Sequence, residues 1–79
     1  MPHVIVKLYT GRNEEQKKGL AEAVADAVVH SLGCERKVVS VALEEIDPAA
    51  WPEQVYRPDI LEKGDRLYLK PGYDPFAES

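Results

Sequence analysis

The sequence has few of the residues that cross-link small domains. Its 79 residues include one cysteine, Cys34, and two histidines, His3 and His30. A lone cysteine cannot form an intramolecular disulfide, and no Cys/His cluster has metal-ligand spacing. Short chains bury modest cores and commonly need disulfides, metals or oligomerisation for stability. We therefore expect a homo-oligomer, with no metal and no cofactor, in which Cys34 is a bystander thiol.

Long apolar runs and basic clusters are also missing. No run approaches the roughly 18–20 apolar residues of a membrane span, and the first residues do not resemble a secretory signal. The formal net charge is −4, and basic residues adjoin at most in pairs, as at Lys17-Lys18 and Arg36-Lys37. These absences argue against membrane and nucleic-acid partners. They predict a reduced, cytoplasmic location.

Several catalytic signatures are absent as well. The glycines are isolated, so there is no phosphate-binding loop, and there is no Gly-x-Ser-x-Gly elbow. Ser31, Ser40 and Ser79 have no neighbouring His and acid in the sequence, although the fold could still bring such groups together. The adjacent Glu44 and Glu45 are better interpreted as a solvated strand end than as an acid/base pair.

The N-terminal half carries clear periodic patterns. Residues 3–9 alternate, which predicts a strand with Val4, Val6 and Leu8 on one face. Helical spacing over residues 14–32 predicts a helix that begins with an Asn13/Gln16 capping box and ends before Gly33.

A second strand is predicted at residues 38–45, with Val39, Val41 and Leu43 on one face. Strand, helix and strand form a β-α-β unit, whose strands should be parallel with a right-handed crossover. The fold class is therefore α/β (α+β), built on a single β-α-β unit.

The pattern weakens after Ile46, and the predicted elements there are short. A short helix is expected within residues 53–63, interrupted by Pro58. A short third strand is expected at residues 66–70, and residues 74–79 are expected to be loosely ordered. The absence of any linker or repeat predicts one domain over residues 1–79.

Two strands covered by one helix cannot stand alone, because one sheet face and both edges remain exposed. Pairing two copies into a four-stranded sheet would bury these surfaces. The natural contact residues are Ile5 of the first strand and Val38, Ser40 and Ala42 of the second. A homodimer is therefore expected from the pattern alone.

Pro2 is the residue with the most chemical interest. Initiator methionine is generally removed before proline, which would make Pro2 an N-terminal secondary amine. A free α-amine has a reference pKa of roughly 7.7–8.0, and apolar surroundings or a nearby cation lower it. Such an amine can act as a general base or attack a carbonyl. If Met1 is retained, the Pro2 nitrogen is an amide and has neither ability.

In several short motifs the chain resembles the tautomerase superfamily, specifically its 4-oxalocrotonate tautomerase-like family. The matching residues, in order, are Met1-Pro2, Gly11-Arg12, Glu14-Glu15-Gln16-Lys17 and the strand that ends in Glu44-Glu45-Ile46. Met1-Pro2-His3, Trp51 and Lys70-Pro71-Gly72-Tyr73 are most similar to the dimeric, phenylpyruvate-enol tautomerase-like branch. The resemblance implies a tautomerase/MIF-like architecture completed by oligomerisation.

The resemblance also implies roles for individual residues. Pro2 matches the catalytic proline, the general base that moves the proton. Arg12 matches an arginine that binds a substrate carboxylate, for which a planar, always charged guanidinium is suited; its alternative is a solvated turn residue. Trp51 matches an aromatic residue that keeps the pocket apolar, and its alternative is core packing.

Ser40 departs from the family pattern. Hexameric members carry a second arginine on this strand, which stabilises developing enolate charge, and a serine cannot supply that charge. The loss of one cation favours a monocarboxylate 2-keto acid, similar to phenylpyruvate, over a dicarboxylate. Candidate groups that replace the arginine are His3, Lys7, Arg57, Arg66, Lys70 and Tyr73.

His3 lies beside Pro2, either as a substrate-binding group or as a histidine at the dimer interface. The predicted function is a keto–enol tautomerase whose site comprises Pro2, His3, Arg12, Ser40 and Trp51. The alternatives are a related proline-dependent dehalogenase or hydratase and a non-enzymatic dimer that binds a small anion or a protein. The long segment after Trp51 favours a dimer over a hexamer.

Overall fold

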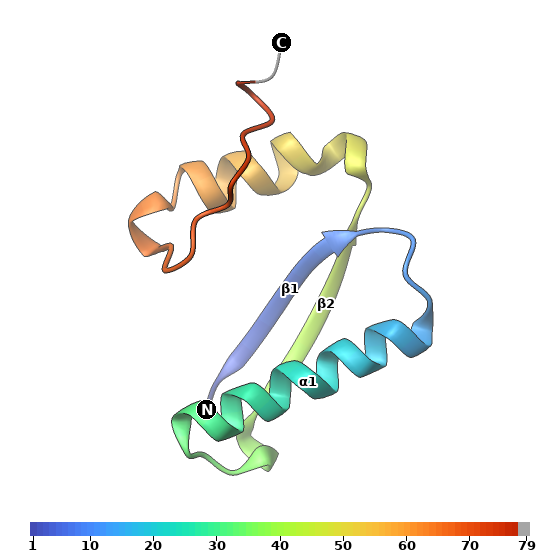
Figure 1. Ribbon diagram of the computed structural model, residues 1–79, viewed down its shortest axis with the longest axis vertical. Helices are drawn as coiled ribbons and strands as arrows, with labels where there is room; N and C mark the ends of the chain where they lie inside the picture. The colour runs from blue at the N-terminus through green and yellow to red at the C-terminus, as the bar shows by residue number, and fades with distance from the viewer. Residues whose placement is uncertain (78–79) are drawn as a thin grey trace. The chain divides into compact units, whose positions relative to one another are not determined.

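The computed structural model describes residues 1–77, and the chain divides into two compact units, Met1–Glu45 and Ile46–Ser79. In the first, strand β1 (His3–Tyr9) is followed by helix α1 (Glu14–Leu32) and strand β2 (Ser40–Ile46). Figure 1 shows α1 running alongside the two strands. The predicted β-α-β unit is therefore confirmed.

The two strands pair from their first residues. The backbone N–H of Ser40, at the start of β2, donates to the carbonyl of Pro2, just before β1, over 3.2 Å. Because the two beginnings lie together, the strands run parallel, as predicted.

Local hydrogen bonds fix both ends of α1. The Asn13 side chain accepts the Gln16 N–H at 2.7 Å, and the Gln16 side chain accepts the Asn13 N–H at 3.1 Å. Gly33 has φ 69° and donates its N–H to the Val29 carbonyl. The capping box and the left-handed glycine confirm both predicted ends, and a cap of this kind contributes about 1 kcal/mol.

The second strand begins later than predicted. Residues Arg36–Val38 form a 3-10 turn, η1, whose bond runs from the Val39 N–H to the Arg36 carbonyl. The Arg36 side chain pairs with Glu22 and Asp26 of α1. This tertiary contact holds the backbone in a turn and overrides the strand preference of Val38.

Lys17 links α1 to the end of β2. Its ammonium lies 2.8 Å from a Glu45 carboxylate oxygen and 2.9 Å from one of Glu14. The hydrogen bonds to Glu45 and Glu14 raise the pKa of Lys17. Because Glu45 points toward the helix, Val41 and Leu43 share that face, and Ser40 and Ala42 lie on the opposite one.

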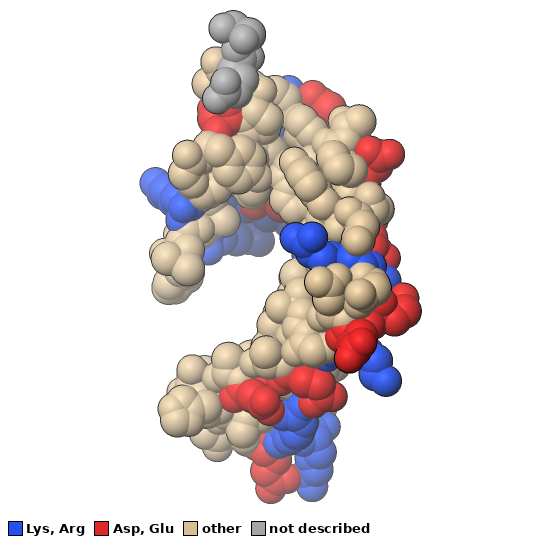
Figure 2. Space-filling model, turned by 45° about the vertical axis from the view of Figure 1, so that its right-hand side comes forward, with Lys and Arg blue, Asp and Glu red and all other residues tan. Residues whose placement is uncertain are grey.

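Acidic and basic side chains lie next to one another on the visible face in Figure 2, which shows no extended patch of one sign. Within residues 1–77, no helix is both long enough and apolar enough to cross a membrane.

The C-terminal unit is built from short turns around one unusual helix. The 3-10 turn η2 (Pro48–Ala50) leads into η3 (Pro52–Leu61), which is a π-helix, and η4 (Gly64–Arg66) is another 3-10 turn. A short helix was predicted here, but Pro58 lies inside η3 and does not interrupt it. Wider i→i+5 winding relieves the clash between a proline ring and the carbonyl four residues earlier.

The predicted third strand at residues 66–70 is wrong. The N–H groups of Arg66 and Leu67 close turns onto the carbonyls of Lys63 and Gly64. Over residues 1–77, the sheet contains only β1 and β2. A strand needs a neighbouring strand to pair with its backbone, and local turn bonds already occupy the N–H groups of Arg66 and Leu67.

The predicted loose tail is wrong for residues 74–77. The Asp74 carbonyl accepts the Ala77 N–H, and its carboxylate accepts the Phe76 N–H at 2.9 Å. The Phe76 ring packs edge-on against Tyr56, with centroids 5.9 Å apart. Residues 78–79 lie outside the described part of the chain.

Candidate active site

The start of the sheet brings Pro2, His3 and Ser40 together. Pro2 is half-buried, and its carbonyl accepts the Ser40 N–H. His3 Nδ1 lies 2.6 Å from Ser40 Oγ, so the two side chains share a hydrogen bond whose donor depends on the histidine tautomer. Residues far apart in the sequence thus form one polar cluster at the first residue of β1.

The chemistry available to this cluster depends on whether the Pro2 nitrogen is an amide or a free amine. Met1 is almost fully exposed, with 97% of its surface accessible. After its removal, Pro2 would carry a secondary amine held next to a strand, with a hydroxyl and an imidazole nearby. That set can accept a proton and hydrogen-bond an oxygen of a small molecule.

Arg12 lies at the other end of β1. It is exposed, and it lines a hollow of ≈ 220 Å³ together with Leu8, Gln16, Lys17 and Leu20. Seven strand residues at about 3.3 Å each place Arg12 about 20 Å from Pro2. One β-α-β unit therefore does not bring these two predicted site residues together.

Trp51 belongs to the C-terminal unit. Its indole N–H donates to the Tyr73 hydroxyl over 2.8 Å, and the side chain is half-buried. This bond fixes the ring orientation and is compatible with both a pocket-lining role and a packing role.

Two candidate replacements for the family's second arginine have other contacts. Arg57 pairs with Glu53 at 2.9 Å and lies 4.4 Å from the centre of the Phe76 ring. Tyr73 accepts the indole N–H of Trp51. His3, in contrast, contacts Ser40 itself, with Nδ1 2.6 Å from Oγ.

Tyr56 is a buried polar residue of the C-terminal unit that was not predicted from the sequence. It is 5% exposed, its hydroxyl donates to the Tyr73 carbonyl over 2.8 Å, and the two rings lie 5.3 Å apart. Burial, and secondarily the Asp74 carboxylate and Tyr73, raise the pKa of its phenol above 10.0. The only sequence signal was a set of aromatic residues around Pro71-Gly72, too far apart in the chain to suggest contact.

Tyr56 should make the stability of the protein pH-dependent. A raised pKa in the folded state means that the neutral phenol is stabilised below pH 10 and that this contribution is lost as pH rises further. Tyr56→Phe should therefore be less stable than wild type at neutral pH, and the difference should narrow toward pH 11. Urea unfolding between pH 7 and pH 11 measures the stability of both proteins. A stability difference that widens with pH would contradict the raised pKa of Tyr56.

Comparisons with known proteins identify a matching family and several similar sequences. A family model described as "Tautomerase enzyme" matches residues 2–55. The "Probable tautomerase" of Xylella fastidiosa is 43% identical over 98% of this chain and 94% of its own. "Tautomerase PptA" of Pectobacterium atrosepticum is 40% identical over 92% of this chain and 97% of its own.

Solved structures match a shorter part of the chain. TomN, a 4-oxalocrotonate tautomerase homologue of the tomaymycin biosynthetic pathway, has a TM-score of 0.62 and 34% identity, covering 63% of this chain and 77% of its own. DmpI from Helicobacter pylori has a TM-score of 0.56 and 33% identity, covering 58% of this chain and 78% of its own. The PptA-type relatives thus share a larger part of this chain than these solved structures do.

Proposed function

The chain belongs to the tautomerase family and is an isomerase; from this premise we propose that it interconverts the keto and enol forms of a small 2-keto acid, with Pro2 as general base after removal of Met1. The observation that carries the proposal is the family match, which includes Pro2 and continues through the β-α-β unit. The cytoplasmic location predicted from composition remains a prediction.

The proposed reaction needs only one proton to move. In the ketonisation direction, the Pro2 amine takes the hydroxyl proton of the enol, and the C2–O bond becomes a carbonyl. The same nitrogen then delivers a proton to C3, where the C2=C3 double bond is lost. An amine with a pKa near neutrality suits both steps, since it must accept and release the proton at the same pH.

Ser40 and His3 supply the proposed hydrogen bond to the substrate oxygen. When His3 donates from Nδ1 to Ser40 Oγ, the serine O–H is free to donate to the enolate oxygen. A neutral hydroxyl stabilises this charge less than a guanidinium does. This difference supports a substrate with one carboxylate, and Trp51 supports one with an aromatic group.

Two protomers are needed if Pro2 and Arg12 act on one substrate, because they lie at opposite ends of β1. Among residues 1–77, only Ala25, Val55 and Tyr56 are well-buried apolar residues, while Ile5 on the sheet is 51% exposed. A core this small supports oligomerisation. We propose a homodimer, with a hexamer as the alternative, in which each copy contributes one domain over residues 1–79.

Substrate preference tests this proposal. With one arginine available for a carboxylate, kcat/KM for ketonisation of phenylenolpyruvate should exceed that for the enol of a dicarboxylic 2-keto acid about tenfold or more. Rates are followed by the loss of enol absorbance. A preference for the dicarboxylate would contradict the role assigned to Ser40.

The alternative is a binding module for small anions on the same scaffold, or a related dehalogenase or hydratase. The family match favours an enzyme. Intact-mass measurement of protein from its native source separates the proline-dependent reactions from the rest: a retained Met1 would remove the amine that all of them require.

A further inference from the structure

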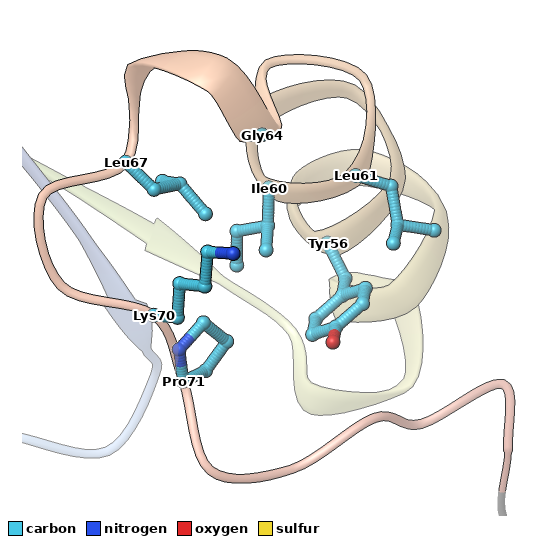
Figure 3. A pocket seen from close by; sticks show the side chains of 7 residues that line it. All are labelled: Tyr56, Ile60, Leu61, Gly64, Leu67, Lys70 and Pro71. Atoms are coloured by element: carbon cyan, nitrogen blue, oxygen red, sulfur yellow. The ribbon is translucent and has the colours of Figure 1, made fainter.

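A pocket of ≈ 290 Å³ lies wholly within the C-terminal unit. It opens between η3 and the following loop, and Figure 3 shows the side chains that surround it. Its walls include Tyr56, Ile60, Leu61, Leu67, Lys70 and Pro71. Pro2, His3, Ser40 and Arg12 do not line it, whereas Lys70, one of the candidate replacements for the family's second arginine, does.

The π-helix shapes one wall of this pocket. Its i→i+5 bonding widens the coil, so residues four and five positions apart share a face. Tyr56, Ile60 and Leu61 have this spacing and all line the pocket. The Tyr56 ring is held in place because its hydroxyl is bonded to the Tyr73 carbonyl. The wall is therefore apolar and preformed.

Lys70 gives the pocket its charge. Among the described residues that line it, Lys70 is the only one with a formal charge, and no carboxylate is present in the lining. Figure 3 shows its side chain among the residues that line the pocket, with the amino group directed toward Ile60. An ammonium group has three hydrogen-bond donors and no acceptor, so an anion beside an apolar wall is the complementary ligand.

We propose that this pocket binds a small monocarboxylate with an apolar, aromatic or branched body. The carboxylate pairs with Lys70, and the body packs against Tyr56, Ile60 and Leu67. A single cation matches one negative charge better than the two of a phosphate group. The volume is close to the lower end of the roughly 300–1,000 Å³ of small-molecule sites, which suits a ligand of this size. This assignment gives Lys70 a ligand of its own in place of the enolate oxygen of the Pro2 reaction.

The test uses 3-phenylpropanoate, which cannot enolise because it has no keto group. Titration into the full-length, Met1-processed protein, followed by amide NMR, should shift the resonances of Ile60, Leu67 and Lys70. Lys70→Met should weaken binding about tenfold or more, the value of one charge-assisted hydrogen bond. The uncharged 3-phenylpropanamide should bind the wild-type pocket more weakly than 3-phenylpropanoate by a similar factor.

Lys63→Met is the matched control. This substitution also removes one positive charge from the C-terminal unit. The Lys63 ammonium, however, lies 3.8 Å from Asp59, and Lys63 does not line the pocket. It should bind 3-phenylpropanoate like wild type, and thermal melts of both variants check that the fold is retained. Equal affinity in wild type and Lys70→Met, or no shift at the pocket amides, would overturn the proposal.

Two further measurements test whether a second copy fills the pocket and whether the pocket acts separately from the catalytic site. Pocket resonances that move with protein concentration and not with 3-phenylpropanoate would show that a second copy fills the site, which also overturns the proposal. Pro2→Ala and Arg12→Ala should both keep the 3-phenylpropanoate shifts of the pocket amides while they impair ketonisation, because neither residue lines the pocket. The failure of the pocket proposal and the failure of the proposed catalytic function are therefore distinguishable.

Discussion

Pro2→Ala is expected to lower kcat for the ketonisation of phenylenolpyruvate about 100-fold or more, within the range contributed by a positioned general base. Alanine retains an α-amine after processing, but it loses the ring that makes the nitrogen a secondary amine and fixes its direction. KM should change much less than kcat, because the nitrogen acts on the moving proton and contributes little to binding. Steady-state kinetics on mass-verified protein provide the measurement.

Pro75→Ala is the control for this substitution. Pro75 lies in the C-terminal turn at residues 74–77, outside the proposed catalytic cluster. Its replacement should leave kcat within a factor of about two, consistent with the small effect of most substitutions away from a site. Equal rates for wild type and Pro2→Ala would remove Pro2 from the mechanism.

Arg12→Ala is expected to lower kcat/KM about 10- to 100-fold, mainly through KM, because a charge-assisted, bidentate contact to the substrate carboxylate is lost. The side chain is exposed and has a hollow beside it, so its removal should leave the fold intact. Lys37→Ala, which removes an exposed cation paired with Glu35, controls for the change in charge.

Mixing these two impaired variants, with activity measured at a substrate concentration far below the wild-type KM, tests whether a site spans two protomers. If Pro2 and Arg12 come from different copies of a dimer, each heterodimer of Pro2→Ala and Arg12→Ala contains one intact site. A statistical mixture refolded together should regain about a quarter of wild-type activity. Activity no greater than the average of the two variants would show that no intact site forms between protomers.

Local patterns determined the β-α-β unit. The alternation in residues 3–9, the Asn13/Gln16 capping box and Gly33 act through neighbours within a few positions in the sequence. Such interactions are present in the sequence itself, so periodicity and capping rules predicted the bounds of β1 and α1. The start of β2 was predicted too early, because the contact that turns Arg36–Val38 comes from distant residues of α1.

The C-terminal unit was predicted less well for the same physical reason. Local rules treated Pro58 as a helix breaker, but a wider helix accommodates it. The β preference of residues 66–70 predicted a strand, but no strand pairs with this segment in the described chain, and turns use the N–H groups of Arg66 and Leu67. Elements that depend on a partner cannot be assigned from a pattern in one segment.

The β-α-β unit and the family resemblance can be predicted from the sequence alone, as can the hypothesis that Pro2 is the base, since each rests on neighbouring residues or an ordered set of short motifs. The folded structure was needed to show that His3 contacts Ser40 across 37 positions, that Arg12 lies at the opposite end of β1, and that Lys70 lines an apolar pocket with Tyr56. These arrangements depend on contacts between segments distant in sequence, whose geometry exists only after the chain has folded.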